Sequence, residues 1–168
     1  MRDLLMKLLY VLATCSLAFN AVADVASQLV VENPFARAAI MQQRNSAAFM
    51  QLRNPTETAA VVSASSPVAG IVELHTHIND QGVMRMRKIS QIELPAGQTV
   101  SLQPGGLHVM LLGLKRDLNP GDEIELTLIL SDGSEKQLLI PVQRVMMHKM
   151  KQMQGHQIDG SLPPMMKH

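Results

Sequence analysis

The sequence predicts an all-β protein, built as an antiparallel sandwich or barrel. Short runs of β-type residues alternate with turn residues, and no long stretch repeats its apolar residues at the period of a helix. The clearest run is Glu123 to Leu130, where every second residue is Ile or Leu and most of the others are polar. We therefore expect one face of that strand in the core and the other in solvent.

Nine strands follow from this pattern. They are expected at Gln28–Glu32, Ala47–Arg53, Ala59–Ala64, Gly70–Ile78, Val83–Ile89, Thr99–Leu102, His108–Leu112, Glu123–Leu130 and Lys136–Val142. Asp132-Gly133 predicts a hairpin between the last two, and Pro104-Gly105-Gly106 and Asn119-Pro120-Gly121-Asp122 predict turns elsewhere.

The first 23 residues have the features of a secretory signal peptide. Two basic residues and an apolar run from Leu8 to Phe19 precede Ala21-Val22-Ala23, so we expect cleavage before Asp24 and export from the cytoplasm. Cys15 leaves a second route open, because the residues before it resemble a lipoprotein cleavage site. No later stretch has the roughly 20 apolar residues of a membrane-spanning helix.

Residues 24–143 are expected to form one domain of ordinary size. The chain has 15 basic and 14 acidic residues; the signal holds two and one of these, which leaves 13 of each. This balance argues against nucleic acid or an anionic membrane as the main partner. Cys15 is the one cysteine, so the exported chain has no disulfide and no thiolate site, but the whole chain carries 13 methionines.

Residues 144–168 form a tail with six methionines and three histidines, broken by glycine and proline. We expect this segment to be flexible, without a fixed fold. Two interpretations stay open. The tail could capture copper, including Cu(II) through its imidazoles, or it could be an inert basic end.

His75, His77, Met84 and Met86 flank a predicted turn. If Asn79 to Gly82 form a four-residue loop, His77 lies opposite Met84 and His75 lies opposite Met86. Directly opposed side chains have Cβ atoms about 5 Å apart, within reach of a shared metal ion. This segment therefore offers two His/Met pairs on one face of a hairpin.

His108 and Met110 are two positions apart in a predicted strand, so both project from one side. Thioethers are soft, neutral ligands that suit Cu(I) and serve poorly for Zn(II). A blue-copper electron carrier would need a cysteine ligand, which the exported chain lacks. The donors therefore favour Cu(I).

The spacing H-x10-M-x21-H-x-M, formed by His75, Met86, His108 and Met110, resembles the signature of the periplasmic PCu(A)C copper chaperones. The flanking segments 82–86, 94–97 and 104–111 are also similar to that family, and the likeness runs from about Val31 to Val142. The resemblance implies a cupredoxin-like Greek-key β-sandwich and a Cu(I) site with these four ligands. It also implies delivery to the CuA centre of cytochrome c oxidase, in its subunit II.

Other residues near the motif receive plainer interpretations. His77 and Met84 are surplus to four-coordinate Cu(I), so we expect a solvated or supporting histidine and a packing or shielding methionine. The remaining expectations are that Met41 and Met50 lie in the core, that Glu73 and Asp80 are solvated, and that Arg85 and Arg87 point away from the Met84/Met86 face.

No catalytic triad, phosphate loop or paired-carboxylate site is recognisable, so we do not expect an enzyme. The first hypothesis is a metallochaperone that holds one Cu(I) and passes it to an acceptor protein. Copper storage or resistance, with several ions bound by the tail, is the alternative. A metal-free scaffold whose methionines only pack is the third.

Overall fold

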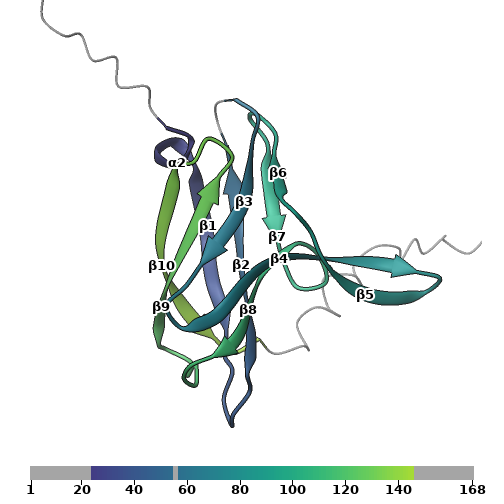
Figure 1. Cartoon of the computed structure of the whole chain (residues 1–168), viewed down its shortest axis with the longest axis vertical. Coiled ribbons are helices and arrows are strands. Elements are labelled where there is room, and N and C mark those ends of the chain that lie inside the picture. The colour runs from purple at the N-terminus through teal and green to yellow at the C-terminus, as the bar shows by residue number, and fades with distance from the viewer. Residues whose placement is uncertain (1–23, 55–56, 146–168) are drawn as a thin grey trace, which may run out of the picture.

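The computed structural model describes residues 24–54 and 57–145, and they are nearly all strand (Figure 1). The elements in chain order are α2 (Val25–Gln28), β1 (Val30–Arg37), β2 (Asn45–Arg53), β3 (Ala59–Ser65), β4 (Ala69–Asp80), β5 (Val83–Lys88), β6 (Ile92–Leu94), β7 (Thr99–Leu102), β8 (His108–Leu114), β9 (Glu123–Leu130) and β10 (Glu135–Gln143). The predicted all-β class is confirmed. No helix of the described residues is long and apolar enough to cross a membrane.

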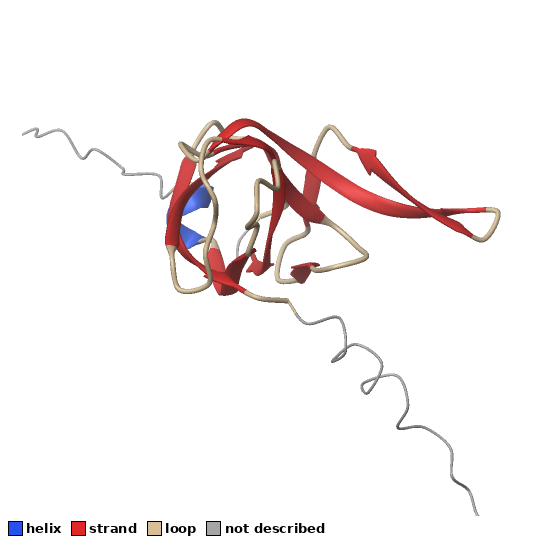
Figure 2. Ribbon diagram, turned by 90° about the horizontal axis from the view of Figure 1, so that it is seen from below, coloured by secondary structure: helices blue, strands red, loops and turns tan. Residues whose placement is uncertain are grey.

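The strands form one open, rolled sheet in the order β5-β4-β8-β2-β1-β10-β9-β3-β6, with β7 paired to β2. All the strand pairs are antiparallel except β1 with β10. The sheet curls around its core, while the β4–β5 hairpin extends well beyond the body of the fold (Figure 2). The edge strand β5 is exposed along its whole length.

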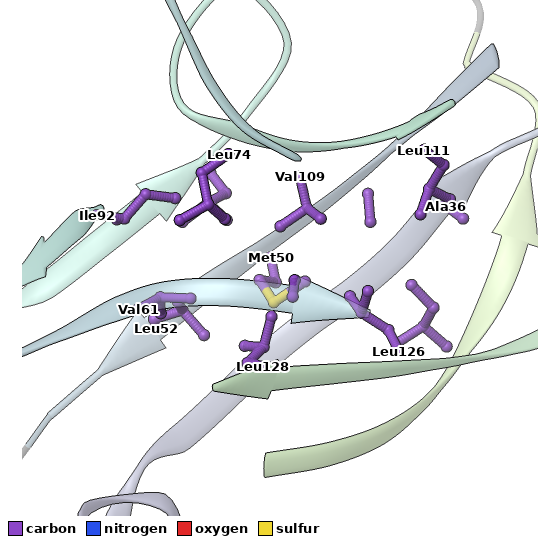
Figure 3. Packing of buried hydrophobic residues seen from close by; sticks show 14 of the residues in the cluster. Ala36, Met50, Leu52, Val61, Leu74, Ile92, Val109, Leu111, Leu126 and Leu128 are labelled. Atoms are coloured by element: carbon purple, nitrogen blue, oxygen red, sulfur yellow. The ribbon is translucent and has the colours of Figure 1, made fainter. Parts of the chain in front are cut away.

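The core lies between the two halves of the rolled sheet. Leu74, Val109 and Leu111 project from β4 and β8 toward Leu126 and Leu128 of β9, and all five are buried (Figure 3). Because side chains alternate along a strand, the residues between these core positions on β4 and β8 must project outward. The core therefore determines which residues line the outer face.

Most strand predictions are confirmed, and the differences have local causes. β7 and β9 have the predicted bounds, and β9 alternates as expected. The three-residue strand β6 was not predicted, because so short a run carries little periodicity. Gln28 ends a helix instead of starting a strand, because Asp24 caps that helix by accepting a hydrogen bond from the Ser27 amide (2.7 Å).

The register predicted for the β4–β5 hairpin is wrong by two residues. Asp80 pairs with Val83, so the loop is only Gln81-Gly82, and both residues have positive φ (51° and 86°). Such a turn matches the twist of the flanking strands, and the Asn79 side chain accepts a hydrogen bond from the Gly82 amide (2.7 Å). A shift of two preserves the face of each side chain. It nevertheless gives each residue of the hairpin a different partner on the opposite strand.

The two methionines assigned to the core have different positions. Met50 is buried among the core residues, as predicted. Met41 lies in the β1–β2 turn with a positive φ of 58° and is 87% exposed, so its core assignment is wrong. The segment predicted to be a signal peptide, 1–23, and tail residues 146–168 lie outside the described residues.

Candidate metal centre

A row of side chains crosses the outer face of five neighbouring strands. From β1 to β5 its members are Phe35, Phe49, His108, His75 and Lys88. His75 lies directly opposite both His108 and Lys88, and the two imidazole ring centroids are 5.7 Å apart. Phe49 lies between Phe35 (5.2 Å) and His108 (6.2 Å) and forms an aromatic wall on one side of the histidines.

Met110 belongs to the next row of the same face. It follows His108 by two residues on β8, and it lies between Ala47 of β2 and Glu73 of β4. The rigid β4–β8 ladder therefore holds three of the four predicted ligands, His75, His108 and Met110.

One carbonyl oxygen determines the orientation of His108. Its Nδ1 donates a hydrogen bond to the Gly106 carbonyl (3.0 Å), in a tight turn where the Gly106 amide bonds back to the Gln103 carbonyl (3.0 Å). The side chain is buried, and its Nε2 has no hydrogen-bond partner among the described residues. With Nδ1 protonated, Nε2 carries the lone pair that can bind a metal ion.

The Glu73 carboxylate determines the orientation of His75. Oε2 of Glu73 is 2.9 Å from His75 Nε2, and Oε1 accepts a hydrogen bond from Lys88 Nζ at 2.8 Å. These bonds, the one from Lys88 first, lower the pKa of the Glu73 carboxyl. An ionised carboxylate only accepts, so His75 Nε2 carries the proton and Nδ1 the lone pair. That Nδ1 is buried, and it too lacks a partner in the described part of the chain.

Two buried nitrogens with free lone pairs are costly to leave unpaired, and they fit a metal ion. Each imidazole has its other nitrogen bonded to an oxygen, the usual arrangement behind a histidine that binds metal. In residues 24–54 and 57–145, no group of three or more His, Cys, Asp and Glu side chains could hold a metal ion. The residues present fit a soft ion that also accepts thioether ligands.

Burial keeps His108 neutral. Desolvation is the largest cause that lowers its pKa, and electrostatic interactions with His77, His75 and Arg37 lower it further, while the bond to the Gly106 carbonyl opposes them. A neutral imidazole is the form that binds metal. The apoprotein therefore holds His108 ready for a cation.

Met86 lies opposite His77, at the point where the hairpin leaves the body of the fold. The His77 ring is 5.2 Å from that of His108, and its Nδ1 is 3.4 Å from the Gly106 carbonyl oxygen. Met86 is 43% exposed; Met84 is 56% exposed and lies two pairs farther out on the same face, opposite Asn79. The predicted pairs His75/Met86 and His77/Met84 are thus replaced by His77/Met86, with Met84 beyond them.

The flanking charged residues follow the predictions only in part. Arg85 and Arg87 lie on the face opposite to Met86, as expected. Glu73 was expected to be solvated, but it bonds to His75 and Lys88, and Asp80 forms an ion pair with Arg85 (3.1 Å). Sequence patterns did not indicate the roles of Glu73, Phe49 or the Gly106 carbonyl, apart from the predicted turn that contains Gly106.

Comparison with known proteins assigns the family. Residues 29–142 match the family model described as "Putative lipoprotein LpqE-like", and the chain belongs to this family. It is 42% identical over 98 residues to "Putative lipoprotein Lxx21020" of Leifsonia xyli subsp. xyli (57% of this chain, 59% of the relative). It is 39% identical over 108 residues to "Uncharacterized protein RP573" of Rickettsia prowazekii (61% and 60%). The chain thus spans about three fifths of the length of these curated relatives.

Solved structures of PCuAC domains share the fold. The copper-bound PCuAC domain from PmoF2 superposes with a TM-score of 0.61 at 20% identity, over 73% of this chain and 97% of that domain. The solution structure of CuI-DR1885 from Deinococcus radiodurans matches with a TM-score of 0.55 at 32% identity, over 76% and 85%. The predicted cupredoxin-like β fold is therefore confirmed.

Proposed function

We propose that this chain is a periplasmic copper metallochaperone. It binds one Cu(I) ion through His75, Met86, His108 and Met110 and delivers it to an acceptor protein, the CuA centre of cytochrome c oxidase subunit II. The copper ion is cargo, so we expect no enzymatic turnover. Export through the signal peptide 1–23 is part of the proposal.

The observation that carries the proposal is a pair of buried nitrogens, His75 Nδ1 and His108 Nε2, that have no partner in the described part of the chain and belong to the face that also holds Met110. Two imidazoles and two thioethers are neutral, so the bound ion keeps its single positive charge. This donor set favours Cu(I) over Zn(II).

Exposure of Met86 supports the delivery step. Three of the proposed ligands project from the central ladder, whereas Met86 comes from the exposed edge strand. An acceptor ligand can reach the metal from the Met86 side, take the place of that thioether, and draw the ion away by exchange. A fully enclosed site would hold copper but release it slowly.

Relatives add independent support. The Deinococcus structure is that of a Cu(I) form, CuI-DR1885, and the PmoF2 domain is described as copper-bound. The identity of 32% to the first is high enough to argue for a shared site as well as a shared fold. The family description as a lipoprotein supports export.

The test is an anaerobic Cu(I) titration of residues 24–168, followed by mixing with a purified CuA domain. One tight ion per chain and its transfer to that domain are the expected results. Several ions of similar affinity would instead favour storage, in which the methionine-rich tail binds copper. Absence of binding would favour a metal-free scaffold.

A further inference from the structure

Five basic side chains line two adjoining hollows at the end of the fold where the β1–β2 turn lies. One hollow, of about 440 Å³, is lined by Arg37, Ala38, Gln43, Arg44, Asn45, Arg144 and Val145. The other, of about 360 Å³, is lined by Gln42, Gln43, Arg44, Leu114, Lys115, Arg116 and Asp117. Asp117 is the one carboxylate among these lining residues.

Four of the five cations have no carboxylate partner in the described part of the chain, and three of these four have no side-chain hydrogen bond there either. Arg116 pairs with Asp122 (2.8 Å), and Lys115 Nζ donates to the Pro67 carbonyl (2.9 Å). Arg37, Arg44 and Arg144 form no ion pair and no side-chain hydrogen bond with any described residue. We call these three the arginine cluster. Like charges gathered without compensation repel one another, so an anionic partner would stabilise them.

Arg37 connects the arginine cluster to the candidate metal centre, because it lines one hollow with Arg44 and Arg144 and lies on the face of the sheet that carries the candidate ligands. Arg37 follows Phe35 by two residues on β1, so it projects to the same side. The ladder runs from Arg37 to Ala47 and then to Met110, because Ala36 pairs with Ala48 and Ala47 with Met110. Two strand spacings, about 10 Å, separate the backbones of Arg37 and Met110. The small Ala47 side chain leaves no bulky barrier in the row between them.

The other flank of the metal centre is also free of net negative charge. Glu73 lies beside Met110 there, but it is bonded to Lys88 and His75. A protein that approaches the face carrying the candidate ligands therefore meets the arginine cluster on one side. On the other side it meets the Glu73 carboxylate, whose charge is balanced by Lys88.

We propose that the arginine cluster is the docking surface for an acidic patch on the copper-accepting protein. The inference rests on the proposed function, because the partner contacts the cluster while its ligand reaches the metal. Complementary charge accelerates encounter and fixes the orientation of two proteins. Position favours a protein partner: Arg37 lies on the face that carries the candidate ligands and lines one hollow with Arg44 and Arg144, so one partner can cover both the hollow and the metal centre.

The test measures Cu(I) transfer from residues 24–168 to three synthetic peptides by stopped flow. All three share one Met/His copper-binding segment, flanked by glutamate, serine or lysine. In the triple variant Arg37→Gln, Arg44→Gln, Arg144→Gln, we expect about a tenfold slower transfer to the glutamate peptide at about 20 mM salt, and little difference at about 500 mM. Transfer to the serine peptide and Cu(I) affinity should stay unchanged.

Arg53→Gln is the matched control, since it removes an exposed arginine at the distant end of β2. It should leave the rate to the glutamate peptide nearly unchanged. Equal slowing by Arg53→Gln, or equal slowing with the serine peptide, would overturn the proposal. So would an unchanged rate in the triple variant.

Further measurements distinguish the docking proposal from the proposed Cu(I) function and from membrane binding. Chemical-shift changes in the copper-free protein should place a glutamate peptide on the arginine cluster, and their absence would count against docking even if Cu(I) binds as proposed. Conversely, failure of the unchanged protein to bind Cu(I) refutes the proposed function by itself. If the triple variant loses binding to phosphatidylglycerol–phosphatidylcholine vesicles (about 1:3) while transfer is unaffected, the cluster is a membrane contact and the proposal is wrong.

Discussion

His75 and His108 lie directly opposite each other on β4 and β8, and they use different ring nitrogens for their hydrogen bonds. His75 is bonded through Nε2 to Glu73 and His108 through Nδ1 to Gly106, so among residues 24–54 and 57–145 His75 Nδ1 and His108 Nε2 have no partner. Neither choice follows from the spacing of the motif. Each depends on which oxygen the fold places beside the ring.

The hairpin register predicts different roles for its two methionines. Met86→Leu should weaken Cu(I) binding at least about tenfold, since loss of a ligand should cost no less than loss of a supporting group. Met84→Leu is the matched control, because Met84 lies two pairs farther out on the same face, opposite Asn79. It should change the affinity little. Competition with a Cu(I) chelator measures both. Equal losses in the two variants would contradict the assignment.

Glu73 is predicted to act through His75. Glu73→Ala removes the acceptor of the His75 Nε2 proton and should weaken Cu(I) binding by about 10- to 100-fold. Glu73→Gln keeps an acceptor oxygen and should lose much less. The nitrogen-15 shifts of His75 in the apoprotein should show Nε2 protonated in the unchanged chain and mixed tautomers in Glu73→Ala. A single tautomer in both would argue against this role.

Stability of the apoprotein should fall as pH drops from about 7 to about 5. Burial lowers the pKa of His108 in the folded state, whereas an unfolded histidine titrates near 6.5. Below that pH the unfolded chain takes up a proton that the folded chain refuses, so the free energy of unfolding falls, by at most about 1.4 kcal/mol per pH unit for this group.

His108→Gln should remove most of this slope, as measured by urea unfolding at several pH values. Glu73, Asp122 and Asp132 also have lowered pKa values, but their contributions are lost only as pH falls below about 4.5. The two pH windows are therefore separate. An unchanged slope between pH 7 and 5 in His108→Gln would show that His108 is not its source.

The tail is predicted to assist copper capture without contributing a ligand to the Cu(I) site of the β domain. The structure places Arg144 in the arginine cluster, so the truncated chain should end at Val145. It should keep tight Cu(I) binding, lose any extra Cu(II) binding, and take up copper more slowly at low supply, because a tethered segment raises the local ligand concentration. Loss of the tight site would place tail residues among the ligands.

The β class and the face on which each candidate ligand lies can be predicted from the sequence, because both depend on the two-residue period of a β-strand. β9 shows this most clearly. The hairpin partners could not be derived in the same way, since registers two residues apart place the same side chains on the same face. The choice between them depends on Gln81, a residue type that rarely signals positive φ.

The hydrogen bonds from Lys88 to Glu73 and from His108 to the Gly106 carbonyl also could not be predicted from a sequence pattern. Lys88 is 15 residues from Glu73, and the two meet only because the hairpin has the observed register. The acceptor for His108 is a backbone carbonyl, which no residue type identifies. Met41 misled the core prediction for a similar reason, because hydrophobicity does not reveal a turn tip.

X-ray absorption of the anaerobic Cu(I) complex of residues 24–168 tests the central claim most directly. The proposed site predicts both sulfur and nitrogen neighbours at copper, with two thioethers and two imidazoles in the first shell. The sulfur contribution should drop in Met86→Leu and in Met110→Leu and persist in Met84→Leu. A spectrum with only nitrogen and oxygen neighbours would contradict the assignment of Met86 and Met110.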